Sequence, residues 1–149
     1  MTTDSSSQPG KFTTTRRVEF CDTDMAGIVH FSTFYKWMEQ AEHDYFRSLG
    51  LSIVTQTPDG GTIGWPRVMA KCRFEAPAKY DDLIELRLTV VRRGVKSLTY
   101  SCEFWCGETR LAIGDMKTVS CTLKPGEKLQ SIEIPTEFDA IQEWHQTTD

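Results

Sequence analysis

Two aspartates and a glycine lie just before the expected start of a helix, in the stretch Asp22-Thr23-Asp24-Met25-Ala26-Gly27. The first residues of a helix carry backbone N–H groups without an internal partner and about half a positive charge. A carbonyl oxygen that rests there is polarised, and a carboxylate beside it can attack the carbonyl carbon or activate water. Asp22 and Asp24 can equally well cap turns, which is the commoner role of aspartates in loops. The stretch therefore indicates an acyl-transfer site or a capped loop, and spacing alone favours the loop.

A long helix is expected directly after this stretch, over about residues 31–49. Ser32 or Thr33 can cap its start, and Gly50 stands where a helix-ending glycine is common. The apolar residues follow the three- and four-residue spacing of one wide helical face: Phe34, Met38, Ala41 and Tyr45, with Phe31, Trp37 and Phe46 beside them. Because this face is broad, we expect the helix to be buried.

Strands are expected on both sides of the helix. One alternating segment precedes it and four follow, at about residues 16–20, 67–74, 84–90, 98–104 and 110–123. The short turns between the later segments imply antiparallel neighbours. This order predicts an α+β domain in which a curved antiparallel sheet of about five strands wraps around one long central helix.

Two places are expected to interrupt the strands. Residues 52–65 contain Pro58 and three glycines, which predicts a loop. Gly114-Asp115 breaks the alternation of the last long segment and predicts a bulge.

Composition argues against several classes of function. The chain has 149 residues, which suits one domain, and 17 Lys and Arg against 21 Asp and Glu give a net charge of −4. No basic excess therefore favours a nucleic-acid partner. The sequence shows no apolar run long enough to span a membrane and no secretory signal over residues 1–11, so we expect a cytoplasmic protein. It also lacks Walker A, GxGxxG, HExxH and GxSxG motifs, so neither a metal nor a bound cofactor is expected.

Three blocks of the sequence stand out together. The first is D-x-D-x-x-G-I-V at residues 22–29, followed by an aromatic residue at Phe34 and an acidic one at Glu39. The second is APAKYDDLIEL at residues 76–86, and the third is Ile132-Glu133-Ile134-Pro135. These blocks resemble the hotdog-fold acyl-CoA thioesterases, and within them the 4-hydroxybenzoyl-CoA thioesterase family, where the second matches the turn into the third strand and the third the closing segment. The resemblance covers about residues 14–138.

The resemblance implies roles for residues around the first block. Asp24 matches the family's catalytic carboxylate, which attacks the thioester carbonyl or activates a water. The backbone N–H groups just past Gly27, at Val29, His30 or Phe31, match the donors that polarise the thioester C=O. The side chain of His30 can be a second catalytic group, a wall of the acyl pocket or only a helix-start residue.

Other side chains carry weaker expectations. A basic hairpin with Arg92, Arg93 and Lys96 occupies the place where the family contacts the CoA nucleotide, although such a charge cluster can also be a solvated turn. Glu39 can hydrogen-bond within a dimer or assist a water. Asp22 is expected to orient the loop.

The resemblance implies one hotdog thioesterase domain over residues 14–145, with a flexible tail at residues 1–13. Such a protein hydrolyses an acyl-CoA thioester to the free acid and CoA, and forms a homodimer or a homotetramer. Acyl-carrier protein is the alternative carrier of the acyl group, and the acyl group itself stays open. Two other functions also stay open: a hotdog hydratase or dehydratase that uses His30, and a non-catalytic acyl-CoA-binding protein.

Overall fold

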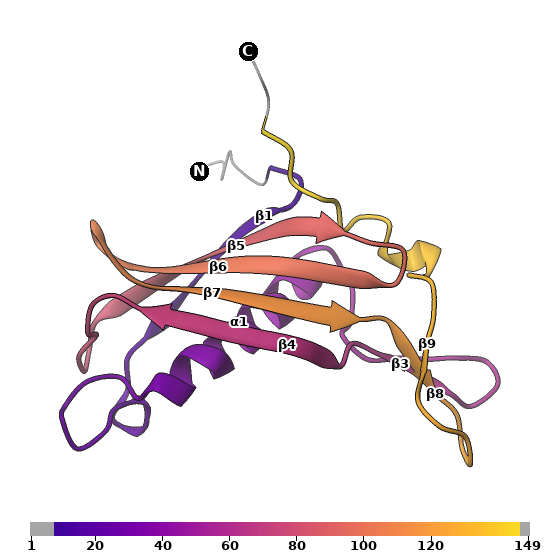
Figure 1. Ribbon diagram of the computed structural model, residues 1–149, viewed down its shortest axis with the longest axis horizontal. Helices are drawn as coiled ribbons and strands as arrows, with labels where there is room; N and C mark the ends of the chain where they lie inside the picture. The colour runs from indigo at the N-terminus through magenta and orange to yellow at the C-terminus, as the bar shows by residue number, and fades with distance from the viewer. Residues whose placement is uncertain (1–7, 147–149) are drawn as a thin grey trace.

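A computed structural model describes residues 8–146, which form one long α-helix against antiparallel strands (Figure 1). The helix is α1 (Phe31–Ser48). The strands are β1 (Lys11–Arg17), β2 (Thr55–Gln56), β3 (Thr62–Gly64), β4 (Arg67–Phe74), β5 (Leu83–Arg93), β6 (Ser97–Cys106), β7 (Thr109–Val119), β8 (Cys121–Leu123) and β9 (Gln130–Ser131). Two short 3-10 helices, η1 (Phe20–Asp22) and η2 (Thr136–Phe138), complete the elements.

The main sheet has five strands in the order β1-β5-β6-β7-β4, and its neighbours are antiparallel. The sheet curves around α1, which crosses its concave side (Figure 1). Strands β1 and β4 form its two edges. The arrangement confirms the α+β prediction of a curved sheet wrapped around a central helix.

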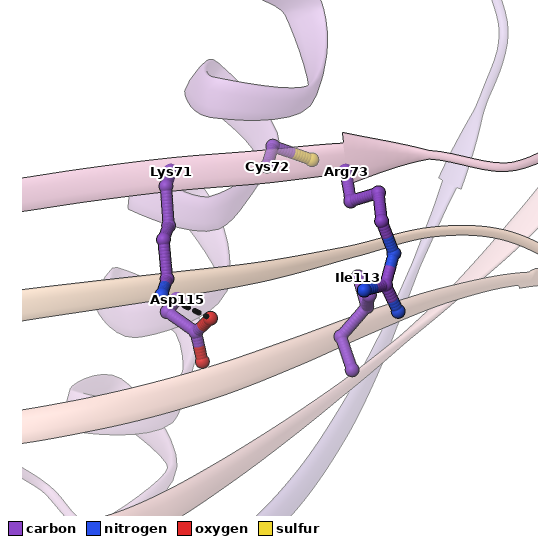
Figure 2. A pocket seen from close by; sticks show the side chains of 5 residues that line it. All are labelled: Lys71, Cys72, Arg73, Ile113 and Asp115. Carbon is purple, nitrogen blue, oxygen red and sulfur yellow. Dashed lines mark ion pairs between the residues drawn. The ribbon is translucent and has the colours of Figure 1, made fainter.

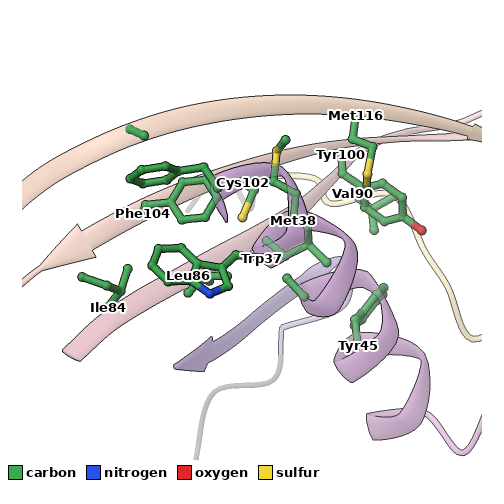
Figure 3. Close-up of a cluster of buried hydrophobic side chains, with 14 of the residues drawn as sticks. Trp37, Met38, Tyr45, Ile84, Leu86, Val90, Tyr100, Cys102, Phe104 and Met116 are labelled. Atoms are coloured by element: carbon green, nitrogen blue, oxygen red, sulfur yellow. The ribbon is translucent and has the colours of Figure 1, made fainter. Parts of the chain in front are cut away.

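The core lies between the buried face of α1 and the inward side chains of the central strands (Figure 3). Met38 of α1 packs toward β7, where Gly114 leaves room for it. A Cβ on Gly114 would lie 2.3 Å from the Met38 sulfur. The predicted bulge at Gly114 is therefore wrong, because the glycine is needed for helix–sheet contact and the register through it is regular. The register shifts lie elsewhere, between Arg67 and Met69 in β4 for example.

Both boundaries of α1 agree with the helix predicted at about residues 31–49, but its N-cap residue differs from the prediction. Gly50 has a φ of +72°, which suits the helix-ending position predicted for it. The N-cap is His30, whose ring nitrogen accepts from the Ser32 N–H, and neither Ser32 nor Thr33 takes that role. Phe31, placed on the buried face by its spacing, is 60% exposed.

The segment predicted as a loop at residues 52–65 contains β2 and β3, which belong to a second, four-stranded sheet of order β2-β3-β8-β9. These strands are only two or three residues long and lie among glycines, so they show no alternation of polar and apolar residues.

Much of the tail predicted at residues 1–13 lies outside the described residues, but Lys11–Thr13 already belong to β1. Among the described residues, no helix is long and apolar enough to cross a membrane.

Candidate active site at the start of the central helix

A tight loop between η1 and α1 carries Asp24. The Asp24 N–H donates to the Ile28 C=O at 2.9 Å, and the Gly27 N–H donates to the Asp24 C=O at 3.0 Å. Gly27 has a φ of +79°, a conformation that favours glycine, with nothing within 4 Å of an added Cβ. One Asp24 oxygen, Oδ1, accepts from the Ala26 N–H at 2.9 Å. The other, Oδ2, has no hydrogen bond within residues 8–146, so it is free to meet a reactant.

Asp22 holds the loop against the helix. Its side-chain Oδ2 accepts from the Glu19 N–H at 2.8 Å, and its backbone C=O accepts from the His30 N–H at 2.8 Å. The same C=O also accepts from the Thr33 hydroxyl at 3.2 Å. These contacts give Asp22 the loop-orienting position expected for it.

The backbone N–H groups at the helix start are not equivalent. The Val29 N–H donates to the Ala78 C=O at 2.9 Å, and the His30 N–H is used by Asp22. The Phe31 N–H has no acceptor among the described residues. Of the three donors that the resemblance leaves open, only Phe31 offers an unspent N–H, at the positive end of the α1 dipole.

The His30 ring has one nitrogen committed to the helix. Its Nδ1 accepts from the Ser32 N–H at 3.2 Å and lies 2.8 Å from the Ser32 hydroxyl oxygen. Since a backbone N–H can only donate, Nδ1 carries no proton in this arrangement and the neutral ring has its proton on Nε2. The ring also lies 4.6 Å from the Phe31 ring, between centroids. His30 is thus a helix cap with one distal N–H donor left over.

Apolar side chains are exposed around this helix start. Phe31 and Phe74 are 60% and 46% exposed, which is unusual for large aromatic side chains. The Phe74 ring packs edge-on against Phe34, with 5.3 Å between centroids, and Phe34 lies one turn after Phe31 on α1. A carboxylate, an unspent N–H donor and aromatic surface therefore occur at one end of the helix.

The basic hairpin lies at the opposite end of the sheet. Strand β5 starts at Leu83, which pairs with Arg17 near the Asp24 loop, and it extends about 33 Å to Arg93. Arg93 is committed to the fold, because its Nη1 donates to the C=O groups of Phe138 and Ile141. Its own N–H donates to Glu143. Arg92 and Lys96 are exposed. Within one chain, the structure does not bring this hairpin to Asp24.

Two acidic residues lie farther along α1. Glu39 is half exposed, with Oε1 3.5 Å from Nη1 of Arg67. Glu42 is fully buried and was not singled out from the sequence, although its place directly after Ala41 and four residues after Met38 puts it on the apolar face. Burial raises the pKa of the Glu42 carboxyl to about 7. It lies about 16 Å along the helix from Phe31, so it belongs to a different part of the molecule.

A hollow of about 270 Å³ occurs elsewhere, at the β4–β7 edge of the sheet (Figure 2). Lys71, Cys72, Arg73, Ile113 and Asp115 line it, and an ion pair of 3.7 Å joins Lys71 to Asp115. It does not include Asp24. In the part of the chain that the structure describes, no three His, Cys, Asp or Glu side chains lie together as a metal site would need.

Comparison with known proteins places this arrangement among thioesterases. Residues 26–113 match the thioesterase superfamily. The chain is 30% identical over 128 residues to the 4-hydroxybenzoyl-CoA thioesterase of Pseudomonas sp. (strain CBS-3), an alignment that covers 83% of this chain and 91% of that protein. It is 28% identical to the 1,4-dihydroxy-2-naphthoyl-CoA hydrolase of Synechococcus sp. (strain CC9605), over 70% of this chain and 73% of that protein.

Solved structures that resemble this chain are also thioesterases. A gentisyl-coenzyme A thioesterase matches with a TM-score of 0.73 and 30% identity, covering 86% of this chain and 99% of that one. A 1,4-dihydroxy-2-naphthoyl-CoA thioesterase from Synechocystis matches with a TM-score of 0.75 and 25% identity, covering 89% and 96%. Together with the sheet wrapped around α1, these neighbours confirm the predicted hotdog fold.

Proposed function

This chain belongs to the thioesterase superfamily, and we propose that it hydrolyses an acyl-CoA thioester to the free acid and CoA. The observation that supports this most is the pairing of Asp24, with Oδ2 unbonded, and Phe31, with its N–H unspent, on either side of Gly27. Together they supply what thioester hydrolysis needs: a nucleophile or base at the carbonyl carbon and a donor at the carbonyl oxygen.

In the proposed reaction, the thioester C=O accepts a hydrogen bond from the Phe31 N–H. The Asp24 carboxylate then attacks the carbonyl carbon, or takes a proton from a water that attacks it. The C–S bond breaks, CoA leaves as a thiolate that takes up a proton, and the acid is released. In the nucleophilic route, water hydrolyses the acyl-Asp24 anhydride in a second step. A backbone donor of this kind typically contributes about 3 kcal/mol to lowering the barrier.

A hydroxylated aromatic acyl group is the substrate class that we propose. The similar proteins are named for 4-hydroxybenzoyl, gentisyl and 1,4-dihydroxy-2-naphthoyl thioesters, all carried by CoA. The exposed rings of Phe31 and Phe74 would offer apolar surface to such a group. His30, whose Nδ1 accepts from the Ser32 N–H, would offer its Nε2 as a donor beside the Phe31 ring.

We further propose a homodimer through the open edge of β4, in the cytoplasm. Val68 and Met69 are exposed along this edge strand, and an exposed edge with apolar side chains is a ready surface for another strand. Antiparallel pairing of two β4 strands about a two-fold axis would set the Arg67 end of one beside the Phe74 end of the other. Arg92 and Lys96 of the second copy would then lie on the same side as Asp24 of the first, where CoA phosphates could reach them.

The test is the release of free thiol from benzoyl-type, short-chain and long-chain acyl-CoAs by the native protein and by Asp24→Asn. We expect turnover on the hydroxyaryl esters and a loss of about a hundredfold or more in the variant. Asp22→Asn is the matched control, since an asparagine can still accept from the Glu19 N–H, and it should stay near native activity. Full activity in Asp24→Asn would show that Asp24 is not the catalytic carboxylate. Tight binding of every ester without turnover would indicate a binding protein instead.

A further inference from the structure

The connection from β4 to β5 lies at the same end of the sheet as the Asp24 loop (Figure 1). It contains most of the sequence block at residues 76–86, to which the proposed reaction gives no role. A turn over residues 79–82 closes this connection, where the Asp82 N–H donates to the Lys79 C=O at 3.1 Å. The Asp82 side chain caps the same turn, because its Oδ2 accepts from the Lys79 N–H at 2.9 Å.

This turn has an unfavourable backbone conformation at Asp81. Its φ is +71°, in the left-handed region that residues other than glycine seldom adopt. Two contacts with the end of the first strand support it. The Asp81 N–H donates to the Val18 C=O at 2.9 Å, and Nη1 of Arg17 donates to the Asp81 C=O at 2.8 Å. The turn therefore depends on hydrogen bonds to keep its shape.

The connection contacts the Asp24 loop on the side of the helix start. Lys79 forms an antiparallel bridge with Ile28. The Val29 N–H donates at 2.9 Å to the C=O of Ala78, the residue just before the turn. The Ile28 C=O also accepts from the Asp24 N–H at 2.9 Å, so the backbone of Asp24 is held by a residue that pairs with the turn.

A pair of aromatic rings joins the turn to the other side of the loop. The Tyr80 ring stacks on the Phe20 ring, with 4.2 Å between centroids and 22° between planes. Phe20 begins η1, which ends at Asp22, just before the Asp24 loop. Because the two residues are 75% and 49% exposed, their stacking adds little to the core and mainly joins the turn to the loop.

We propose that Asp82 is a positioning residue: through the 79–82 turn, it sets where the Asp24 carboxylate and the Phe31 N–H lie relative to each other. Its role in catalysis rests on the proposed thioester hydrolysis. The two groups lie on either side of residues 28–30, so a shift of the backbone there moves one against the other. A misplacement of about 1 Å can slow a reaction on the order of a hundredfold, because both groups must meet one thioester carbonyl.

The test compares thiol release from a hydroxybenzoyl-CoA by Asp82→Ala and Asp82→Asn. Alanine removes the acceptor of the Lys79 N–H, whereas asparagine keeps one. In Asp82→Ala we expect kcat to fall about tenfold while KM changes less than about twofold. Asp82→Asn should keep the native values. Native kcat in Asp82→Ala would overturn the proposal, as would a change in KM alone.

Asp59→Ala is the matched control. Asp59 also caps its own turn, since its Oδ1 accepts from the Gly61 N–H at 3.3 Å. It lies between β2 and β3, away from the Asp24 loop (Figure 1). Asp59→Ala should therefore keep native kcat. An equal fall of kcat in Asp59→Ala and Asp82→Ala would reflect a general loss of stability and would overturn the proposal.

Amide hydrogen exchange tests the positioning without turnover. The Val29 N–H, which donates to Ala78, should exchange about tenfold faster in Asp82→Ala than in the native protein or in Asp82→Asn. Unchanged exchange would overturn the proposal. Faster exchange in a protein that hydrolyses no thioester would support positioning of the loop by Asp82 and would contradict the proposed hydrolysis.

Tyr80→Ala covers an Asp82→Ala variant that does not fold. This substitution removes the stack on Phe20 from an exposed position, so the core stays intact. We expect kcat to fall about threefold and Val29 exchange to rise, whereas Tyr80→Phe keeps the ring and should match the native protein. Native kcat with native Val29 exchange in Tyr80→Ala would overturn the proposal, because the turn would then not control the loop.

Discussion

The carboxylates of Asp24, in the loop before α1, and Glu42, on α1 itself, lie in opposite surroundings. Asp24 stands before the N-terminus of α1, with one oxygen bound by its own loop and the other without a partner among residues 8–146. Glu42 lies inside the molecule against an arginine, and its second oxygen also lacks a partner among these residues but is sealed from water. An unpaired oxygen is available to a reactant in the first case and is a source of instability in the second.

The contrast shows why a strongly raised carboxyl pKa does not mark the proposed active site. The pKa of Glu42 rises because burial removes water from its charge, and burial also keeps out any substrate. The start of α1 instead brings together a carboxylate, an N–H without an acceptor among the described residues, and exposed aromatic rings. We therefore assign the active site to the place that a substrate can reach and where a hydrogen-bond donor is available, not to the carboxyl with the raised pKa.

Removing the arginine from the buried pair is expected to have the largest effect on stability. Arg67→Met leaves Glu42 sealed without its cation, and we expect a loss of about 3 kcal/mol in the free energy of unfolding at pH 8. At pH 5 the loss should be smaller, because a protonated Glu42 no longer needs the cation. Urea denaturation at both pH values measures it.

Arg110→Met is the control for this substitution. Arg110 pairs with Glu75 at 2.7 Å and with Glu103 at 3.2 Å on the outer surface, where all three side chains are partly exposed. Each such pair contributes about 1 kcal/mol or less. Equal losses of stability in Arg67→Met and Arg110→Met would contradict the view that the buried ion pair matters more than the exposed one.

The free energy of unfolding should fall as the pH rises, which is the direction expected from the raised pKa of Glu42. Its folded pKa of about 7 lies above its ordinary value of 4.5, so its contribution to stability is full below pH 4.5 and is lost as the pH rises to 7. Between pH 5 and pH 8 we expect the free energy of unfolding to fall on the order of 2 kcal/mol, partly offset by His43, whose pKa is lowered mainly by burial. Urea denaturation across this range checks the sign, and a rise in stability with pH would contradict it.

Gly27→Ala is expected to separate stability from activity at the open end of the helix. Because φ is +79° and the added Cβ meets nothing, the cost comes from the backbone alone, at about 1 kcal/mol. Gly50→Ala, with a φ of +72° and equally open space, should lose the same stability. Only Gly27→Ala should also lower kcat, and equal activities in the two variants would argue against a catalytic role for the loop.

The helix cap at His30 is expected to affect stability by about as much as Gly27→Ala, with no change in activity needed to test it. His30→Ala removes the acceptor of the Ser32 N–H and should destabilise the protein by about 1 kcal/mol, whereas His30→Asn keeps an acceptor and should change stability little. Thermal unfolding of both variants measures this difference. If His30→Asn were as unstable as His30→Ala, the ring would be holding the helix by packing instead.

The sequence predicted the elements whose patterns are long and local. The spacing of Phe34, Met38, Ala41 and Tyr45 was enough to place α1 and its buried face, and four alternating segments were enough for β4 to β7. The first strand was misplaced: it was predicted at residues 16–20, but β1 is Lys11–Arg17. Strands β2 and β3 were not predicted, because they are too short to show alternation and exist through pairing with β8.

The details of the candidate site depended on contacts between distant segments. The sequence left three N–H donors at the helix start, and the choice of Phe31 required knowing that Ala78 and Asp22 supply acceptors to Val29 and His30. Glu42 stood on the apolar face, but its partner Arg67 comes from another strand. Local spacing carries no information about such pairs.

The most direct measurement of the central claim compares kcat for Phe31→Pro and Phe31→Ala on a hydroxybenzoyl-CoA substrate. Proline is tolerated at the first position of a helix and has no N–H to donate, and the extended backbone of His30 suits the residue before it. Alanine removes the same ring and keeps the N–H. We predict that the proline variant is slower than the alanine variant by about a hundredfold while both stay folded. Equal rates in the two variants would contradict an oxyanion donor at Phe31.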